Sequence, residues 1–166
     1  MHKLIATLLA LGAAAVSIPA AAQLRQQPEL TLAAANRLAT GAVEACRRQG
    51  RDIVVAVVDR GGNLVALQRA DGVGPHNTEA SRRKAYTALS TRTATLVLAR
   101  KAQAEPDARN LSTLPELLLL GGGLPLTAKG QPVGAIGVAG GGGAVNDHAC
   151  ALAALAAVPE LDQPAP

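Results

Sequence analysis

Apolar positions recur at helical spacing in residues 31–49, and the next apolar run is extended. A threonine begins the first segment and a glycine follows it, so we predict a helix over 31–49. Residues 53–58 are apolar without a break and largely β-branched, which is typical of a strand buried on both faces. The glycine-containing turn 59–63 and the apolar run 64–68 then predict a β-hairpin.

The middle of the chain predicts a loop and two helices. Glycines and a proline place a loop at 70–76, after which Asn77 or Thr78 can cap a helix that reaches about residue 90. A second helical segment follows over 91–104, and residues 106–115 are predicted to be irregular.

The last third predicts three short strands and a closing helix. The strands lie near 117–120, 124–127 and 133–139, with a turn at 128–131, and the helix begins at Asn146. The order is therefore helix, hairpin, helices, three strands, helix. This order predicts a single α+β domain with a mainly antiparallel sheet.

The two ends of the chain are expected to lie outside this domain. Residues 1–22 predict a cleaved signal peptide: a weakly basic start, an apolar stretch too short for a comfortable membrane span, and a small-residue cleavage site. A retained anchor is the alternative. We expect a linker over 23–29, the domain over 30–158, a disordered tail over 159–166, and a periplasmic or secreted location.

Composition narrows the classes of function. Tyr86 is the only aromatic residue, so the core is expected to consist of Leu, Val, Ile and Ala in thin helices packed close to a sheet. Nucleic-acid binding is disfavoured because stacking platforms need aromatic rings. The net charge is +4 at pH 7, and the one basic cluster, 82–84, is typical of a solvated helix face.

Two further features bear on chemistry. Cys46 and Cys150 lie on the first and last predicted helices, and the sequence allows either a disulfide between them or two separate buried thiols. No spacing typical of metal ligands occurs in the sequence. Gly140–Gly143 lie between a strand and a helix, where backbone N–H groups can face a ligand. A dinucleotide site is excluded because no strand follows, and a P-loop because no Lys-Ser/Thr follows the glycines.

Four segments, in this order, resemble the GlcG/HbpS family, whose haem-binding members are related to the C-terminal domain of PduO-type cobalamin adenosyltransferases. They are Lys84–Ala88, Gly121–Leu126, Val133–Val138 and Asp147–Leu155. The resemblance implies a profilin-like fold with a central antiparallel sheet of about five strands flanked by helices. It also implies homo-oligomers and the binding of haem or a related tetrapyrrole. The chain departs from the family pattern in the loops 71–77 and 139–144.

The candidate ligand residues lie in and beside these segments. His76 is the first choice as haem iron ligand, with a solvent-facing loop histidine as the alternative. Lys84 can pair with a haem propionate or with Asp71, or form another structural ion pair. Tyr86 can be an axial ligand or pack in the core. The full predicted cofactor-binding set is His76, Lys84, Tyr86, Thr87, Gly140, Gly141, Gly142, Gly143, Asp147 and His148.

The predicted function is therefore an exported, oligomeric small-ligand-binding protein, with haem as the leading ligand and no stable membrane span. No catalytic residue is assigned. The alternative is an enzyme, or an enzyme accessory, that acts on a small carboxylated metabolite with His76, His148, Asp71 and Lys84 as acid–base groups. A structural oligomer without cofactor is a third hypothesis.

Overall fold

The structure is a computed structural model that describes residues 26–163, so the predicted signal peptide over 1–22 lies outside the described residues. The described chain forms helices and strands in the order that follows. They are α1 (Leu32–Arg47), β1 (Val54–Asp59), β2 (Leu64–Arg69), α2 (His76–Thr91), α3 (Thr95–Ala104), α4 (Pro106–Arg109), the 3-10 helix Asn110–Thr113, β3 (Gly123–Ala128), β4 (Gln131–Ala139), α5 (Ala144–Ala154) and the 3-10 helix Leu155–Ala157.

The four strands of this region form one antiparallel sheet in the order β2-β1-β4-β3. In the central pair, Val54 lies opposite Ala139 and Asp59 lies opposite Gly134. The two hairpin turns, 59–63 and 128–131, consequently lie at one end of the sheet, which we call the turn end. The segments 51–53, 70–75 and 140–143 lie at the opposite end, which we call the loop end.

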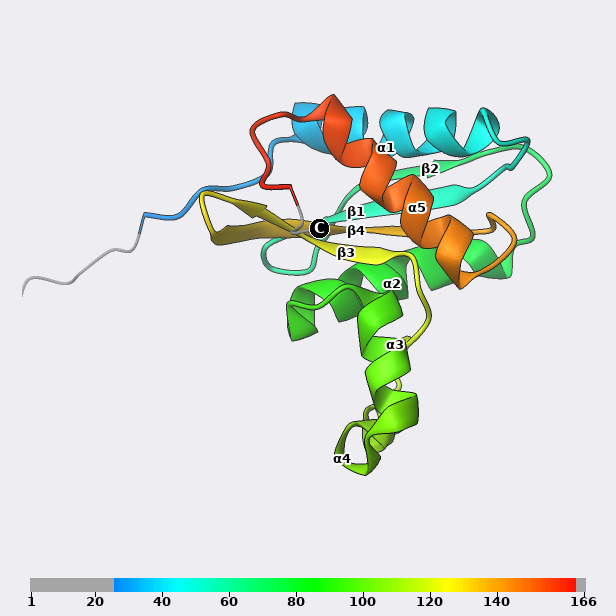
Figure 1. The fold of residues 1–166 in the computed structure, drawn as a ribbon. Helices are drawn as coiled ribbons and strands as arrows, with labels where there is room; N and C mark the ends of the chain where they lie inside the picture. Colours follow the sequence, from blue (N-terminus) through cyan, green and yellow to red (C-terminus); the bar gives the residue numbers. More distant parts are fainter. Residues whose placement is uncertain (1–25, 164–166) are drawn as a thin grey trace, which may run out of the picture.

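Helices cover both faces of the sheet (Figure 1). α1 and α5 lie on one face, α2 lies on the other, and α3 and α4 project away from the α2 side. Because side chains alternate along a strand, Val55 and Val57 belong to the core cluster under α1 and α5, whereas Val58 packs with Ala85 of α2. The α+β class and the antiparallel sheet are as predicted.

α2 lies unusually close to the sheet, as the small side chains predicted. A Cβ atom added at Gly137 of β4 would lie 2.0 Å from the carbonyl oxygen of Ser81 and 3.1 Å from the Cβ of Ala85. The backbones can approach in this way only because position 137 has no side chain. This close approach brings the buried face of α2 within reach of the backbone of β4.

The predicted strand at 117–120 does not form, so the described sheet has four strands rather than about five. The backbone N–H of Leu118 donates to the Thr87 hydroxyl at 2.8 Å, and that of Leu120 donates to the Leu118 carbonyl at 2.9 Å. Both N–H groups are therefore already bonded, one to α2 and one within the run itself. Residues 117–120 form a connection between elements and do not pair with a strand.

Other boundaries also differ from prediction: α3 begins at Thr95 rather than at residue 91, and α5 begins at Ala144 rather than at Asn146. α2 begins at His76 after Pro75, and neither Asn77 nor Thr78 caps it, because both lie inside the helix. Proline is well suited to a helix start because its φ angle is already near the helical value. Residues 106–115, predicted to be irregular, contain α4 and the 3-10 helix Asn110–Thr113.

The predicted tail over 159–166 is packed in part. Leu161 is buried in the core under α1 and α5. The Asp162 carboxylate accepts hydrogen bonds from the backbone N–H groups of Lys129 at 2.9 Å and Gly130 at 2.8 Å. These bonds, the one from Gly130 foremost, lower the pKa of Asp162. The packed domain therefore extends past the predicted boundary at residue 158, and its C-terminal segment holds the β3–β4 turn.

Candidate functional site at the loop end

The loop before α2 and the four-glycine loop are neighbours at the loop end. A Cβ atom at Gly140 would lie 3.0 Å from Cγ1 of Val73 and 3.3 Å from the carbonyl oxygen of Asp52. Val73 is buried with Val54 and Ala70 in a small apolar cluster. Three stretches distant in sequence therefore meet here, and α2 begins three residues after Val73.

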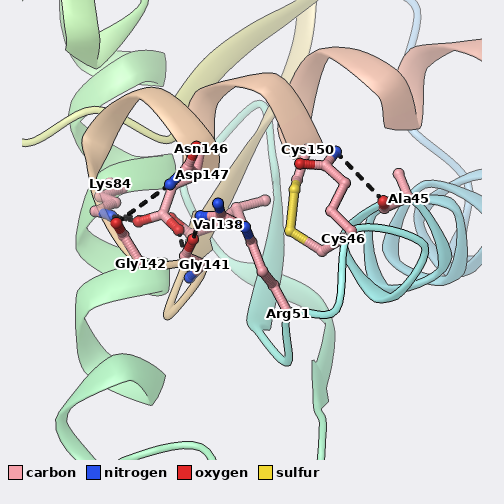
Figure 2. The surroundings of a disulfide bond; sticks show 11 residues. Ala45, Cys46, Arg51, Lys84, Val138, Gly141, Gly142, Asn146, Asp147 and Cys150 are labelled. Carbon is pink, nitrogen blue, oxygen red and sulfur yellow. Dashed lines mark hydrogen bonds and ion pairs between the residues drawn. A yellow bond between two sulfur atoms is a disulfide. The ribbon is translucent and has the colours of Figure 1, made fainter.

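A buried ion pair lies beside these loops. The Lys84 ammonium is 2.8 Å from Oδ2 of Asp147, and the two side chains are 1% and 6% exposed. Lys84 also donates to the Val138 carbonyl at 2.9 Å, and Oδ1 of Asp147 accepts from the Gly141 N–H at 2.7 Å. Figure 2 shows this network next to the Cys46–Cys150 disulfide. Burial lowers the pKa of Lys84, and the Asp147 carboxylate opposes that shift.

The glycine run 121–123 makes room for this pair. A Cβ atom at Gly122, whose φ is +123°, would lie 2.3 Å from the Val138 carbonyl oxygen and 2.9 Å from Cβ of Asp147. A side chain at this position would displace the groups that surround the Lys84 ammonium. The pair is therefore enclosed by backbone as well as by α2 and α5.

Two arginines at the loop end were not predicted. The guanidinium of Arg51 donates to the Gly141 carbonyl, and that of Arg69 donates to the Val73 carbonyl. Each arginine thus tethers one of the two loops. The exposed carboxylates Asp52 and Asp71 belong to the same segments. Arg51 directly follows the glycine predicted to end the first helix, and Arg69 directly follows the predicted second strand. The predicted hairpin alone therefore places both arginines at the same end of the sheet.

The structure places the predicted ligand residues as follows. His76 is exposed at the first position of α2, with its ring beside Gly74. Lys84 is enclosed by Asp147, so of its open alternatives the structure shows a structural ion pair, and the partner is Asp147 rather than Asp71. Thr87 is buried, and its hydroxyl donates to the Arg83 carbonyl and accepts from the Leu118 N–H.

A signal for the buried lysine was present in the sequence. Ser81, Lys84, Ala85 and Ala88 have the spacing of one helix face, and all four are buried. A lysine among small residues on such a face must be paired, because an unpaired buried charge is costly. The spacing therefore predicts a buried partner for Lys84, although not which carboxylate supplies it.

Tyr86 lies at the other end of α2. Its ring packs on the β1–β2 turn, where a Cβ atom at Gly62 would lie 3.1 Å from it. Ten residues separate Tyr86 from His76, which is about 15 Å along a helix axis. Tyr86 therefore belongs to the turn end and not to the group around His76.

His148 is half-buried on α5. Its Nδ1 atom is buried and has no hydrogen-bond partner among the described residues. Burial, and secondarily the charge of Arg100, lower the pKa of His148. Within residues 26–163 no ion pair joins any two of His76, His148, Asp71 and Lys84, the alternative acid–base set, and the partner of Lys84 is Asp147.

The lowered pKa of His148 predicts a pH dependence of stability. In the unfolded chain His148 takes up a proton near its ordinary pKa of 6.5, whereas in the folded protein it resists protonation until a lower pH. The free energy of unfolding should therefore fall as the pH decreases from 6.5 toward the folded pKa. Thermal melts between pH 7.5 and about 5 should show this loss in the native protein and a smaller loss in His148→Gln.

Arg100→Gln offers a matched control, because it removes one of the two causes and leaves the imidazole in place. It should reduce, without abolishing, the pH-dependent loss. Equal pH profiles for the native protein and His148→Gln would contradict the assignment.

Two general features of the described region bear on function. No cluster of three or more His, Cys, Asp or Glu side chains suited to a metal ion occurs within residues 26–163. In the same part of the chain no helix has both the length and the apolar character needed to cross a membrane.

Comparison with known proteins agrees with the fold. Residues 30–156 match the family described as "Haem degrading protein HbpS-like". The protein GlcG of Escherichia coli K12 is 36% identical over 101 residues, which are 61% of this chain and 73% of GlcG.

Solved structures agree with the same family. The crystal structure of HbpS superposes with a TM-score of 0.76 and 44% identity, covering 82% of this chain and 94% of that one. The PduOC:heme complex superposes with a TM-score of 0.73 and 25% identity, covering 83% and 100%. The family match spans most of the described domain, and sequence and structure agree with it. The chain therefore belongs to the HbpS-like family, the GlcG/HbpS family of the sequence resemblance.

Proposed function

We propose that this protein binds haem or a related tetrapyrrole at the loop end of the sheet. The observation that carries the proposal is the exposed imidazole of His76 at the start of α2, beside loops held by two arginines. The family description names haem degradation, and one structural neighbour is a haem complex.

The residues present fit such a group in three respects. His76 is accessible and can offer a ring nitrogen to iron. Arg51 and Arg69 carry guanidinium groups that can pair with propionate carboxylates. Gly142 and Gly143 are exposed and have no side chain to hinder the approach of a flat ligand. Lys84, predicted to be the propionate partner, is replaced in this role by the arginines because Asp147 already holds it.

Haem, when bound, supplies a redox-active iron and a chromophore. The chain's own part is to hold it: His76 orients the iron, and the arginines neutralise the propionates. The half-buried His148, with its unpartnered Nδ1, is the second histidine that could offer a ligand.

A haemin titration followed by absorbance tests the proposal. We expect the purified protein to shift and sharpen the Soret band with a saturable, stoichiometric end point, and His76→Ala to lose this change. Arg69→Gln should bind several-fold more weakly because a charge-assisted hydrogen bond is lost. Arg37→Gln, which removes an exposed charge in the first half of α1, is the matched control and should titrate like the native protein.

Circular dichroism and thermal melts must show that each variant is folded. A native protein that leaves the haemin spectrum unchanged would overturn the proposal. A change that survives in His76→Ala and disappears in His148→Ala would instead move the iron ligand to His148.

We also infer that the protein is exported and oligomeric. The Cys46–Cys150 disulfide supports an oxidising compartment, which is where such bonds persist. Exposed apolar side chains on and near α3, such as Val97, Leu114 and Leu120, support contact with another copy. The mass of the mature chain from a periplasmic fraction and light scattering of the purified protein test these two points.

A further inference from the structure

A cavity lies at the turn end, away from His76. Its volume is about 730 Å³, within the range of small-molecule sites. Its walls come from the last turns of α2, from the β1–β2 and β3–β4 turns, and from the stretch before α1. Segments that are distant in sequence therefore line it, as they do at ligand sites.

The charged side chains that line this cavity are both arginines, Arg60 and Arg92, and no carboxylate lines it among the described residues. Arg92 makes no ion pair or side-chain hydrogen bond within residues 26–163. Arg60 contacts Glu29 at 3.6 Å, and both of these side chains are substantially exposed. Such an exposed pair is weak, so a ligand anion can compete for Arg60.

The backbone at Arg92 is held in a conformation that non-glycine residues seldom adopt. Arg92 ends α2 with φ +51°, in the left-handed region, where glycine is the usual residue. An arginine in this position places a cation beside the C-terminal carbonyls of α2, which would otherwise repel an anion. The guanidinium therefore offsets the helix end that forms part of the cavity wall.

The remaining walls are mostly polar and neutral. Gln131, Gln27 and Ser90 offer amide and hydroxyl groups, and the half-buried Tyr86 contributes a phenol, whereas Leu89 and Pro132 are the apolar exceptions. A large apolar macrocycle is poorly matched to such a lining. A hydroxylated organic anion is well matched, with its charge on the arginines and its hydroxyls on the amides.

We propose that the turn-end cavity binds a small hydroxylated organic anion, a sugar acid or sugar phosphate, through Arg60 and Arg92. This site is separate from the proposed haem site, because α2 runs from one end of the sheet to the other and its 16 residues span about 24 Å. Occupancy of the cavity should therefore leave haemin binding unchanged.

Isothermal titration calorimetry with gluconate, glucose 6-phosphate and citrate tests the proposal, with uncharged glucose as the reference. We expect saturable one-to-one binding of at least one hydroxylated anion and none of glucose. Arg60→Gln and Arg92→Gly should each weaken binding about tenfold or more, because each loses a charge-assisted hydrogen bond. Arg92→Gly is informative because glycine suits the left-handed backbone, so the variant should keep its thermal stability.

Two further variants sharpen the test. Glu29→Gln frees Arg60 from its carboxylate and should tighten binding, while Arg48→Gln, the same loss of charge at the far end of α1, should leave it unchanged. The absence of saturable binding by every anion up to millimolar concentrations would overturn the proposal. So would equal weakening by Arg48→Gln, or loss of haemin binding in the Arg60 and Arg92 variants, which would make this cavity the haem site.

Discussion

Lys84→Met should lower the free energy of unfolding by about 3–5 kcal/mol, the range for breaking a buried ion pair by removing one partner. The substitution keeps most of the volume of the side chain but leaves the Asp147 carboxylate buried without its cation. The carboxylate would keep only its hydrogen bond from the Gly141 N–H. Urea denaturation at pH 7, followed by circular dichroism, measures the change.

Asp147→Asn should destabilise the protein to a similar degree, because it leaves the Lys84 ammonium enclosed with the Val138 carbonyl and a neutral amide. The double variant Lys84→Met/Asp147→Leu removes both charges and should lose much less than the sum of the two single losses. That non-additivity separates an ion-pair effect from a general packing defect.

Lys101→Met is the matched control. Lys101 and Glu105 form an ion pair at 3.6 Å on the surface of α3, with both side chains more than half exposed. Its loss should cost less than about 1 kcal/mol. Equal losses for Lys84→Met and Lys101→Met would show that the buried pair has no special role in the fold.

Removal of the disulfide should have an effect of comparable size. Cys46 of α1 and Cys150 of α5 are joined across 104 residues of sequence, and both are buried. A cross-link over a loop of about 100 residues restricts the unfolded chain by up to about 4.7 kcal/mol in the chain-entropy estimate, and measured losses are about 2–5 kcal/mol. We expect Cys46→Ala/Cys150→Ala to lose stability in this range.

The reductant provides an internal comparison. Dithiothreitol should lower the melting temperature of the native protein toward that of the double variant, and it should leave the double variant unchanged. Alkylation of the folded, non-reduced protein should label neither cysteine. Labelling of both, or a melting temperature that the double substitution does not alter, would contradict the disulfide.

The disulfide and the ion pair both lie against the four-glycine loop. A Cβ atom at Gly141 would lie 2.8 Å from Oδ1 of Asp147 and 3.5 Å from Sγ of Cys46. The four-glycine loop is therefore held between the two cross-links, with Arg51 on its carbonyl (Figure 2). Gly141 is therefore held at both its carbonyl and its N–H group, beside the proposed haem site.

Local pattern determined most of the elements. The helix predicted over 31–49 could be recognised because threonine is a residue type that caps helices and because apolar residues recur at helical spacing. In the structure Thr31 does cap the helix, since its hydroxyl accepts a hydrogen bond from the Ala34 N–H. The buried strand β1 and its hairpin were evident because an unbroken β-branched run precedes a turn whose Asp59 side chain binds the backbone of Gly61 and Asn63. The prediction of a strand over 117–120 was wrong because an apolar tetrapeptide has strand-like composition whether or not a neighbouring strand has room to pair with it.

The sequence by itself therefore determined the fold class, the order of most elements and the family, because periodicity and short motifs are set by residues close together in the chain. Only the tertiary structure decided that Lys84 pairs with Asp147, that Cys46 bonds to Cys150, and that Tyr86 packs on the β1–β2 turn. The first two choices join residues 63 and 104 positions apart. Such partners depend on how helices pack across the sheet, and no local spacing encodes that.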